Sequence, residues 1–360
     1  MKVSIRKGLV ELFGSRILTF LTVTLLLFIS VSFIASLILQ ARVKEELALI
    51  KKAGAPVILK DMAPDVPERG QNAARLYTAA MDLVDFNPAY FPEKQDEMSS
   101  YYTKCRDEMP AILSRNSMTL QILDEVKSRP VCRYDLRYED GYRMRILDLK
   151  KVKEIVRLSS MKAMYEIDNR QPEKASETVA TALRFLRTLE PEIILTQVVR
   201  AKFRSILEAP LKALTDSGFR NYPPTLRSEI DAITTGSLRE LEAVIFGERA
   251  IGVQVFNEIC SNGTTDIFRD EISSEHLKWK MALETQLPGK PILYYDELKF
   301  LDRWNRVITA IQKGEKPGDM KVSDLFTTLS WMLLPNCRKM VENNEKTRLI
   351  YVEIEKKIKR

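Results

Sequence analysis

The residues best suited to binding chemistry lie in the segment RPVCRYDLRYEDGYRMR, residues 129–145, where arginine and tyrosine recur at intervals of four. Guanidinium groups form paired hydrogen bonds with carboxylates and phosphates, and tyrosine rings offer flat faces for stacking on an anionic polymer, a lipid head group or an acidic protein. The candidate binding residues are Arg133, Tyr134, Arg137, Tyr138 and Arg143. The alternative is structural: neighbouring carboxylates neutralise part of the charge and the tyrosines pack against adjacent helices.

Residue types for nucleophilic or metal-assisted catalysis are scarce. His276 is the only histidine, so every Ser–His, Cys–His or multi-histidine metal scheme would depend on that one residue. The motifs H-E-x-x-H, G-x-G-x-x-G, G-x-x-x-x-G-K-[ST] and G-x-S-x-G are absent. We therefore predict no catalytic residue, no metal site and no cofactor.

Three glutamates, Glu240, Glu242 and Glu248, lie close together on one predicted helix. Carboxylates of this kind serve glycosidases or hold divalent cations, so a cell-envelope hydrolase acting through carboxylates is the alternative function. Arg239 and Arg249 beside them favour a plainer interpretation, a solvated helix surface crossed by salt bridges.

Four cysteines, Cys105, Cys132, Cys260 and Cys337, are scattered along the chain and form no C-x-x-C motif. Their spacing does not predict a metal site. In an exported domain they allow up to two disulfides in three possible pairings, and buried free thiols are the other interpretation.

The element expected to hold all of these groups at a membrane is the apolar run Ile17–Leu39, which contains no charged residue. Sixteen of its 23 residues are Leu, Ile, Phe or Val. As a helix it is about 35 Å long, enough to cross the ~30 Å hydrocarbon layer of a bilayer. Its Ser and Thr hydroxyls can bond to carbonyls in the preceding turn. We predict a single transmembrane helix that binds the lipid bilayer through Ile17–Leu39.

The formal net charge of +7 is concentrated around this run. Residues 1–60 hold nine Lys or Arg and three Glu, so the rest of the chain is nearly neutral and nucleic-acid binding is not expected. Both flanks of the run are basic, so the positive-inside rule barely separates the two orientations. The short basic leader favours a signal-anchor, with the large domain outside the cytoplasm; a cytoplasmic domain in reversed topology is the alternative.

Beyond the run the pattern is helical almost throughout, and no run of alternating β-branched residues predicts a strand. Pro110 is expected to open a helix that reaches Val126, and another helix is expected over residues 191–218. The most regular part is a hairpin: helices over residues 146–167 and 175–189, joined by a tight turn marked by Asn169 and Pro172. Alanines on the second helix are expected to face its partner. This geometry is TPR-like, without the TPR consensus.

These patterns predict an all-α chain, in which a single N-terminal transmembrane helix is followed by an elongated bundle of antiparallel helix pairs. The expected divisions are a basic leader (1–16), the transmembrane helix (17–39), a juxtamembrane helix and linker (40–70) and an all-helical domain (71–360).

The NAARLY sequence at residues 72–77 and the run of apolar and alanine positions from Ile146 to Leu214 resemble a group of bacterial proteins of unknown function. These are single-pass, membrane-anchored, all-helical proteins of planctomycete-like bacteria, and the resemblance extends over about residues 70–315. Such proteins often continue into a G-x-Y-P-x-x-L segment, which does not occur before Arg360. The resemblance implies the architecture and no activity.

The function expected from the sequence is therefore that of a membrane-tethered interaction or scaffold protein. Grooves between helix pairs are expected to form the binding face, and the partner is expected to be a protein or a second copy of the chain. The envelope hydrolase remains the alternative.

Overall fold

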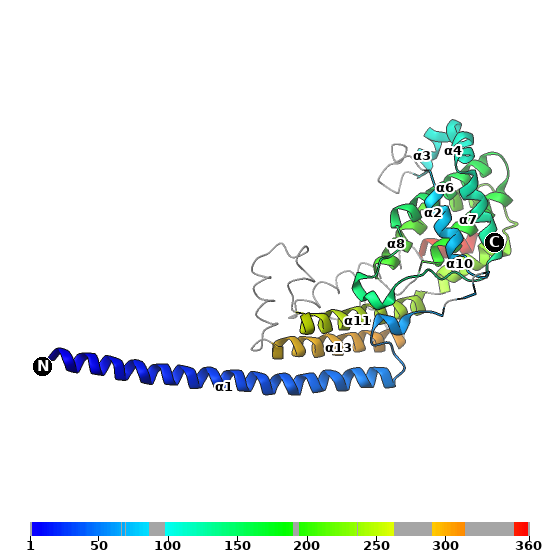
Figure 1. Cartoon of the computed structure of the whole chain (residues 1–360). Coiled ribbons are helices and arrows are strands. Elements are labelled where there is room, and N and C mark those ends of the chain that lie inside the picture. Colours follow the sequence, from blue (N-terminus) through cyan, green and yellow to red (C-terminus); the bar gives the residue numbers. More distant parts are fainter. Residues whose placement is uncertain are drawn as a thin grey trace. The chain divides into compact units, whose positions relative to one another are not determined.

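The computed structural model of the chain describes residues 2–65, 67–68, 70–85, 98–189, 194–235, 237–262, 290–313 and 349–358 (Figure 1). These residues fold into helices joined by turns and loops, and they contain no β-strand. Their one isolated bridge pairs Asn72 with Val131. The predicted all-α class is confirmed.

The chain divides into two compact units. The first consists of Met1–Ile58 and Arg249–Arg306, and the second of Leu59–Glu248 and Val307–Arg360. The segment expected to form one domain over residues 71–360 therefore contributes to both units, because residues 249–306 group with the N-terminal helix. Two long helices, α11 (Ser237–Asn262) and α13 (Lys290–Gln312), each contribute residues to both units.

The first unit is built on α1 (Lys2–Lys52), a continuous helix of 51 residues that includes the predicted span and continues beyond it. The helix ends just before Gly54, whose φ of 74° is a conformation that glycine adopts at little cost. From Ser32 onward one stripe of α1 is buried. Its buried residues are spaced by four or seven positions, the repeat with which helices pack along one another: Ser32, Ser36, Val43 and Ile50.

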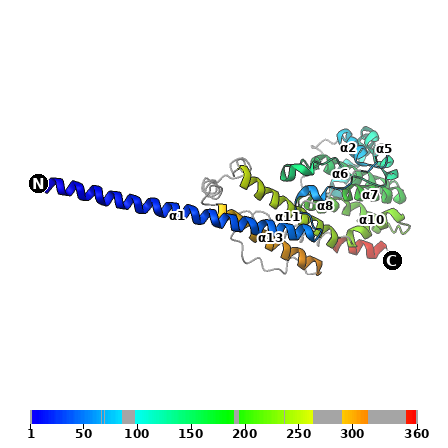
Figure 2. The same ribbon diagram turned by 60° about the horizontal axis from the view of Figure 1, so that its bottom comes forward.

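Within the first unit, α11 and α13 run beside the C-terminal half of α1 in both views (Figures 1 and 2). Phe256 of α11 packs against Phe300 of α13 with ring centroids 5.5 Å apart, and Phe300 packs against Trp304 at 5.9 Å. Gly252 allows this close approach, because a Cβ atom there would lie 2.0 Å from Phe300 Cζ. These aromatic side chains form a core between α11 and α13.

The second unit is a bundle of shorter helices joined by 3-10 turns. Its α-helices are α2 (Ala74–Leu83), α3 (Met98–Cys105), α4 (Met109–Arg115), α5 (Ser117–Glu125), α6 (Leu149–Asp168), α7 (Pro172–Arg187), α8 (Ile194–Arg204), α9 (Glu208–Asp216) and α10 (Pro224–Thr235), with a helical segment over residues 349–358. Its 3-10 helices are η1 (Leu59–Met62), η4 (Arg106–Glu108), η5 (Val126–Ser128), η6 (Tyr138–Arg143) and η7 (Ser205–Leu207). The core runs through the unit and includes Tyr77, Ile155, Phe185, Leu211 and Tyr351.

The predicted hairpin is confirmed as α6 and α7. Its turn closes with a hydrogen bond of 2.8 Å from the Gln171 N–H to the Glu166 carbonyl, the longer bond of a Schellman motif. Arg170 supplies the left-handed residue of this turn, with a φ of 58°. Pro172 then begins α7, where its missing N–H is not needed. The alanines expected to face the partner are buried, as Ala175 and Ala182 show.

Two predicted helices are interrupted. The helix expected over residues 191–218 is divided into α8 and α9 by η7, because Pro210 has no N–H for the carbonyl of Ile206 and the chain tightens into a 3-10 turn before it. The helix expected from Pro110 to Val126 is split at Asn116. The buried side-chain amide of Asn116 accepts from the Asp85 N–H at 2.9 Å and donates to the Asp85 carbonyl at 3.0 Å.

Candidate functional site

The clearest functional surface is the apolar part of α1. From Ile17 to Val31 every side chain is exposed, so the apolar surface extends around the whole circumference of the helix. The hydroxyls of Thr22 and Thr24 donate to carbonyls one turn earlier at 2.8 Å, as predicted. Among the described helices, only α1 is long and apolar enough to cross a membrane. A helix that is apolar all round is stable in lipid or inside a protein core, and this part of α1 is not inside a core.

The predicted Arg–Tyr segment is held at its start by Asn72. The side-chain amide of Asn72 donates to the Arg133 carbonyl at 2.8 Å and accepts from the Arg133 N–H at 2.9 Å. Arg184 of α7 donates to the carbonyls of Lys127 and Arg129 just upstream. Residues 127–133 are therefore fixed by side chains from elsewhere in the second unit.

The five candidate residues of this segment lie at different depths. Tyr134 and Tyr138 are 7% and 4% exposed, whereas Arg133, Arg137 and Arg143 are exposed. The Tyr134 hydroxyl lies 3.3 Å from Thr188 Oγ1, and burial raises the pKa of Tyr134 well above its usual value. The two rings belong to the packing of the second unit and offer no face for stacking. Anion binding by the three exposed arginines stays a prediction.

A buried ionic cluster connects α8 to α11 within the second unit. Arg200, which is 1% exposed, donates from Nη2 to Glu240 Oε1 at 2.9 Å. Arg204 Nη2 lies 4.0 Å from Glu240 Oε2, so two guanidinium groups share one carboxylate. Burial, followed by the charge of Arg200, lowers the pKa of Arg204 to about 10. Removing the Glu240 charge would take away the carboxylate that the two buried cations share.

The solvated surface expected around the α11 glutamates is wrong for Glu248 and Arg249, which are 5% and 3% exposed. Arg249 donates to Asn305 Oδ1 at 2.8 Å and to the Pro56 carbonyl at 3.0 Å, and burial lowers its pKa to about 10. These residues lie one helical turn from the buried Ile245, on the packed side of α11. Their charge in the sequence had suggested an exposed position instead.

Glu242, by contrast, fits the expected surface. Its carboxylate accepts a hydrogen bond of 2.8 Å from Gln312 Nε2 in an exposed position. Glu240 and Glu242 are two residues apart, which places their side chains on different sides of the helix. The structure therefore does not bring the three predicted glutamates together.

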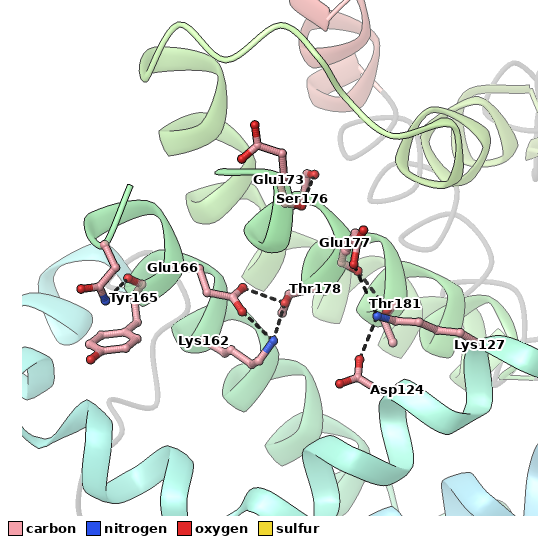
Figure 3. Close-up of polar contacts among 11 residues, drawn as sticks. Asp124, Lys127, Lys162, Tyr165, Glu166, Glu173, Ser176, Glu177, Thr178 and Thr181 are labelled. Carbon is pink, nitrogen blue, oxygen red and sulfur yellow. Dashed lines mark hydrogen bonds and ion pairs between the residues drawn. The ribbon is translucent and has the colours of Figure 1, made fainter. Parts of the chain in front are cut away.

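A polar ring links α6 to α7 inside the hairpin (Figure 3). Lys162 Nζ lies 2.7 Å from Glu166 Oε1 and donates to Thr178 Oγ1 at 2.7 Å. The Thr178 hydroxyl donates in turn to Glu166 Oε2 at 2.7 Å. Each group contacts the other two, so the ring links the two helices in one register.

The first unit contains a buried carboxylic acid, Glu297 on α13, which is 1% exposed. Burial raises the pKa of Glu297 to about 7. Burial and then the charge of Glu297 raise the pKa of the neighbouring Cys260 thiol to about 11. Cys260 is therefore protonated near neutral pH and is a poor nucleophile.

Two described glutamates have a pKa that burial raises, Glu297 and Glu229, and they belong to different units. Glu229, the other described glutamate whose pKa is raised by burial, is bound to Arg187 at 2.9 Å and not to a second acid. The described residues also contain no group of three side chains suited to a metal ion. The predicted candidate His276 lies outside the described residues.

Three of the four cysteines form no disulfide: Cys105, Cys132 and Cys260. Cys105 is buried, as one of the two predicted alternatives required. Cys337 lies outside the described residues.

Comparisons of the chain with protein-family models, curated proteins and solved structures find no match. The function is therefore inferred from the residues and contacts above.

Proposed function

We propose that the chain is a membrane-tethered helical interaction protein, in which α1 is the anchor and the second unit is the partner-binding part. The observation that supports this most strongly is the exposed apolar circumference of α1 from Ile17 to Val31. Each Leu, Ile, Phe or Val near the bilayer centre favours insertion by about 0.3 to 0.6 kcal/mol, so the segment as a whole favours the membrane by several kcal/mol.

The proposed orientation has the N-terminus in the cytoplasm of a bacterium and the second unit outside, with α1 acting as a signal-anchor. The support is the short basic leader that contains Lys2, Arg6 and Lys7 directly before an N-terminal apolar run, an arrangement typical of a signal-anchor. The resemblance to single-pass proteins of planctomycete-like bacteria agrees with this arrangement and is part of the proposal.

The proposed partner is a protein or a second copy of the chain. Paired helices such as α6 and α7 form rigid surfaces suited to binding another chain, and the polar rings and ion pairs inside the second unit serve its packing. The exposed Arg133, Arg137 and Arg143 favour an acidic surface on that partner.

Membrane attachment is tested by fractionating cells that express the full chain. We expect the protein in the membrane fraction, resistant to alkaline washing. The double variant Leu25→Arg, Phe28→Arg should move to the soluble or aggregated fraction, because each arginine at the bilayer centre costs about 3 kcal/mol. Met118→Arg, at an exposed position of α5, is the matched control and should stay in the membrane. A wild-type chain that the alkaline wash releases would refute the anchor.

Orientation and partner need separate measurements. A reporter enzyme that is active only outside the cytoplasm, fused after Arg360, should be active. An inactive reporter would show that the second unit lies in the cytoplasm, contrary to the proposed orientation. Affinity purification from solubilised membranes should recover a protein partner or a differently tagged second copy. The triple variant Arg133→Glu, Arg137→Glu, Arg143→Glu should reduce this recovery. If it does not, the three arginines do not take part in partner binding.

A further inference from the structure

The outward face of α13 changes in chemical character along its length. Between Ile292 and Thr309 the exposed positions of this helix recur at intervals of three or four and therefore form one continuous face: Ile292, Tyr295, Lys299, Asp302, Arg306 and Thr309. The face begins with two large apolar side chains, Ile292 and Tyr295, which are 52% and 50% exposed. It continues with a cation, Lys299, and then with an ion pair of 2.9 Å between Arg306 and Asp302.

The C-terminal half of α1 shows the same order. Its exposed residues are mainly apolar as far as Leu37 and Ile38. From Arg42 onward most of them are charged, with four cations (Arg42, Lys44, Lys51 and Lys52) and one anion (Glu45). Within the first unit α13 runs beside this half of α1 and in the same direction (Figures 1 and 2). Two adjacent helices of one unit therefore change from mainly apolar to mainly charged along the same direction.

This order matches the boundary of a membrane. Tyrosine rings are enriched at the level of the head groups, because one part of the ring is apolar and its hydroxyl is polar. Lysine beside them is attracted to anionic phosphates, and its stem reaches from apolar to polar surroundings. Lys299 Nζ lies 5.4 Å from the centre of the Tyr295 ring, so the aromatic and the cationic groups form one surface.

We infer that α13 is a second membrane-contacting element: its first turns lie in the head-group layer, with Ile292 and Tyr295 against lipid and Lys299 at the level of the phosphates. The inference rests on the proposed anchoring by α1. We favour lipid over a protein as the binding partner of this face. The order of exposed residues along the face is the same as along the neighbouring part of α1, the proposed anchor. The contact fixes the first unit against the bilayer, which a single flexible tether does not do.

The test places a fluorescent amino acid, one position at a time, in the full chain in vesicles of phosphatidylcholine and phosphatidylglycerol. The positions are Ile292, Arg306 as the control on the same face, and Phe28 in the apolar part of α1. Arg306 lies 14 residues beyond Ile292, about 21 Å along the helix and well beyond a head-group layer. Quenchers are attached either to the lipid head group or to the middle of the acyl chain.

We expect the head-group quencher to reduce the fluorescence at Ile292 several-fold more than at Arg306, and the acyl-chain quencher to act most strongly at Phe28. If Phe28 is quenched and Ile292 behaves like Arg306, the inference is overturned and the anchor stands. If Ile292 is shielded from lipid quenchers and from aqueous iodide, a protein surface occupies the face, which also overturns it. If Phe28 itself is not quenched, the proposed anchoring fails first.

A charge variant provides a second measurement. Tyr295→Asp places an anion beside the phosphates and should increase hydrogen exchange of the first turns of α13 in anionic vesicles. The same substitution in detergent micelles without anionic lipid should have a smaller effect. Equal effects in both media would mean that Tyr295 acts through packing, and would contradict the lipid contact.

Discussion

Ser160 Oγ donates a hydrogen bond of 3.0 Å to the carbonyl oxygen of Ile206, the acceptor that Pro210 cannot serve because proline has no N–H. The serine is fully buried on α6, 46 residues away from η7. One side chain therefore compensates in the tertiary structure for a bond that the local sequence removes. The break between α8 and α9 is stable because α6 supplies the missing donor.

We expect Ser160→Ala to destabilise the second unit by about 1 to 2 kcal/mol, because it leaves a buried carbonyl without a donor. Equilibrium denaturation of the full chain in detergent, followed by hydrogen exchange of α6 and α8, measures this loss. The control is a double-mutant cycle with Pro210→Ala, which restores a backbone N–H at that position. In the Pro210→Ala background, Ser160→Ala should then cost less stability. Equal losses of stability in both backgrounds would show that the Ser160 hydrogen bond does not compensate for Pro210.

Glu240 should be the most sensitive carboxylate of α11. Glu240→Gln removes the charge that two buried arginines share, and we expect a loss of about 2 to 3 kcal/mol, below the full cost of breaking a buried pair because Glu240 is 26% exposed. Glu242→Gln, two residues along the same helix, is the matched control and should change stability by less than about 0.5 kcal/mol. Denaturation of the three proteins under one condition compares them. Equal losses for both variants would contradict the ionic cluster.

Gly252 should not tolerate a side chain. Gly252→Ala places a Cβ atom against the Phe300 ring, and we expect a loss of about 1 to 3 kcal/mol from overpacking. Faster hydrogen exchange in α11 and α13 reports it. Gly70→Ala, whose Cβ would meet no atom within 4 Å, should have little effect. In the double variant Gly252→Ala, Phe300→Leu the smaller side chain should relieve part of the clash, so the combined loss should be less than the sum of the two.

Stability of the first unit should fall as the pH rises. The pKa of Glu297 is raised from 4.5 to about 7 in the folded chain, so the folded state binds the proton more tightly than the unfolded state does. The contribution is complete below about pH 4.5 and is lost as the pH passes through about 7, a difference on the order of 3 kcal/mol. The neighbouring Cys260 remains neutral over this range. Thermal unfolding measured across this range tests the slope, and Glu297→Gln should flatten it. A slope that survives the substitution would assign the effect to another group.

Sequence patterns correctly predicted the elements whose structure depends on residues close together in the chain. The apolar run predicted α1, because hydrogen bonds inside a helix and an apolar circumference follow from composition alone. Asn169 and Pro172 predicted the turn between α6 and α7, because turn conformations depend on the preferences of a few adjacent residues. The juxtamembrane helix expected within residues 40–70 is the last part of α1, which continues to Lys52.

For the Arg–Tyr segment, residues 129–145, the sequence pattern did not predict the arrangement of the side chains. Its intervals of four suggested one binding face, yet the structure buries Tyr134 and Tyr138 and exposes the arginines. The segment is not an α-helix: an irregular stretch held by Asn72 is followed by η6, so intervals of four do not place its residues on one side. Asn72 lies 61 residues away, and the sequence gives no reason to associate it with Arg133.

The sequence by itself determined the helical class, the long apolar helix and the hairpin, since each depends on the residue pattern within a short stretch of the chain. Only the tertiary structure decided which polar groups are buried and which groups they lie beside: Arg200 with Glu240, Ser160 with Ile206, and Glu297 with Cys260. Such pairings depend on how distant helices pack, and a charge looks the same in the sequence whether it faces water or another helix.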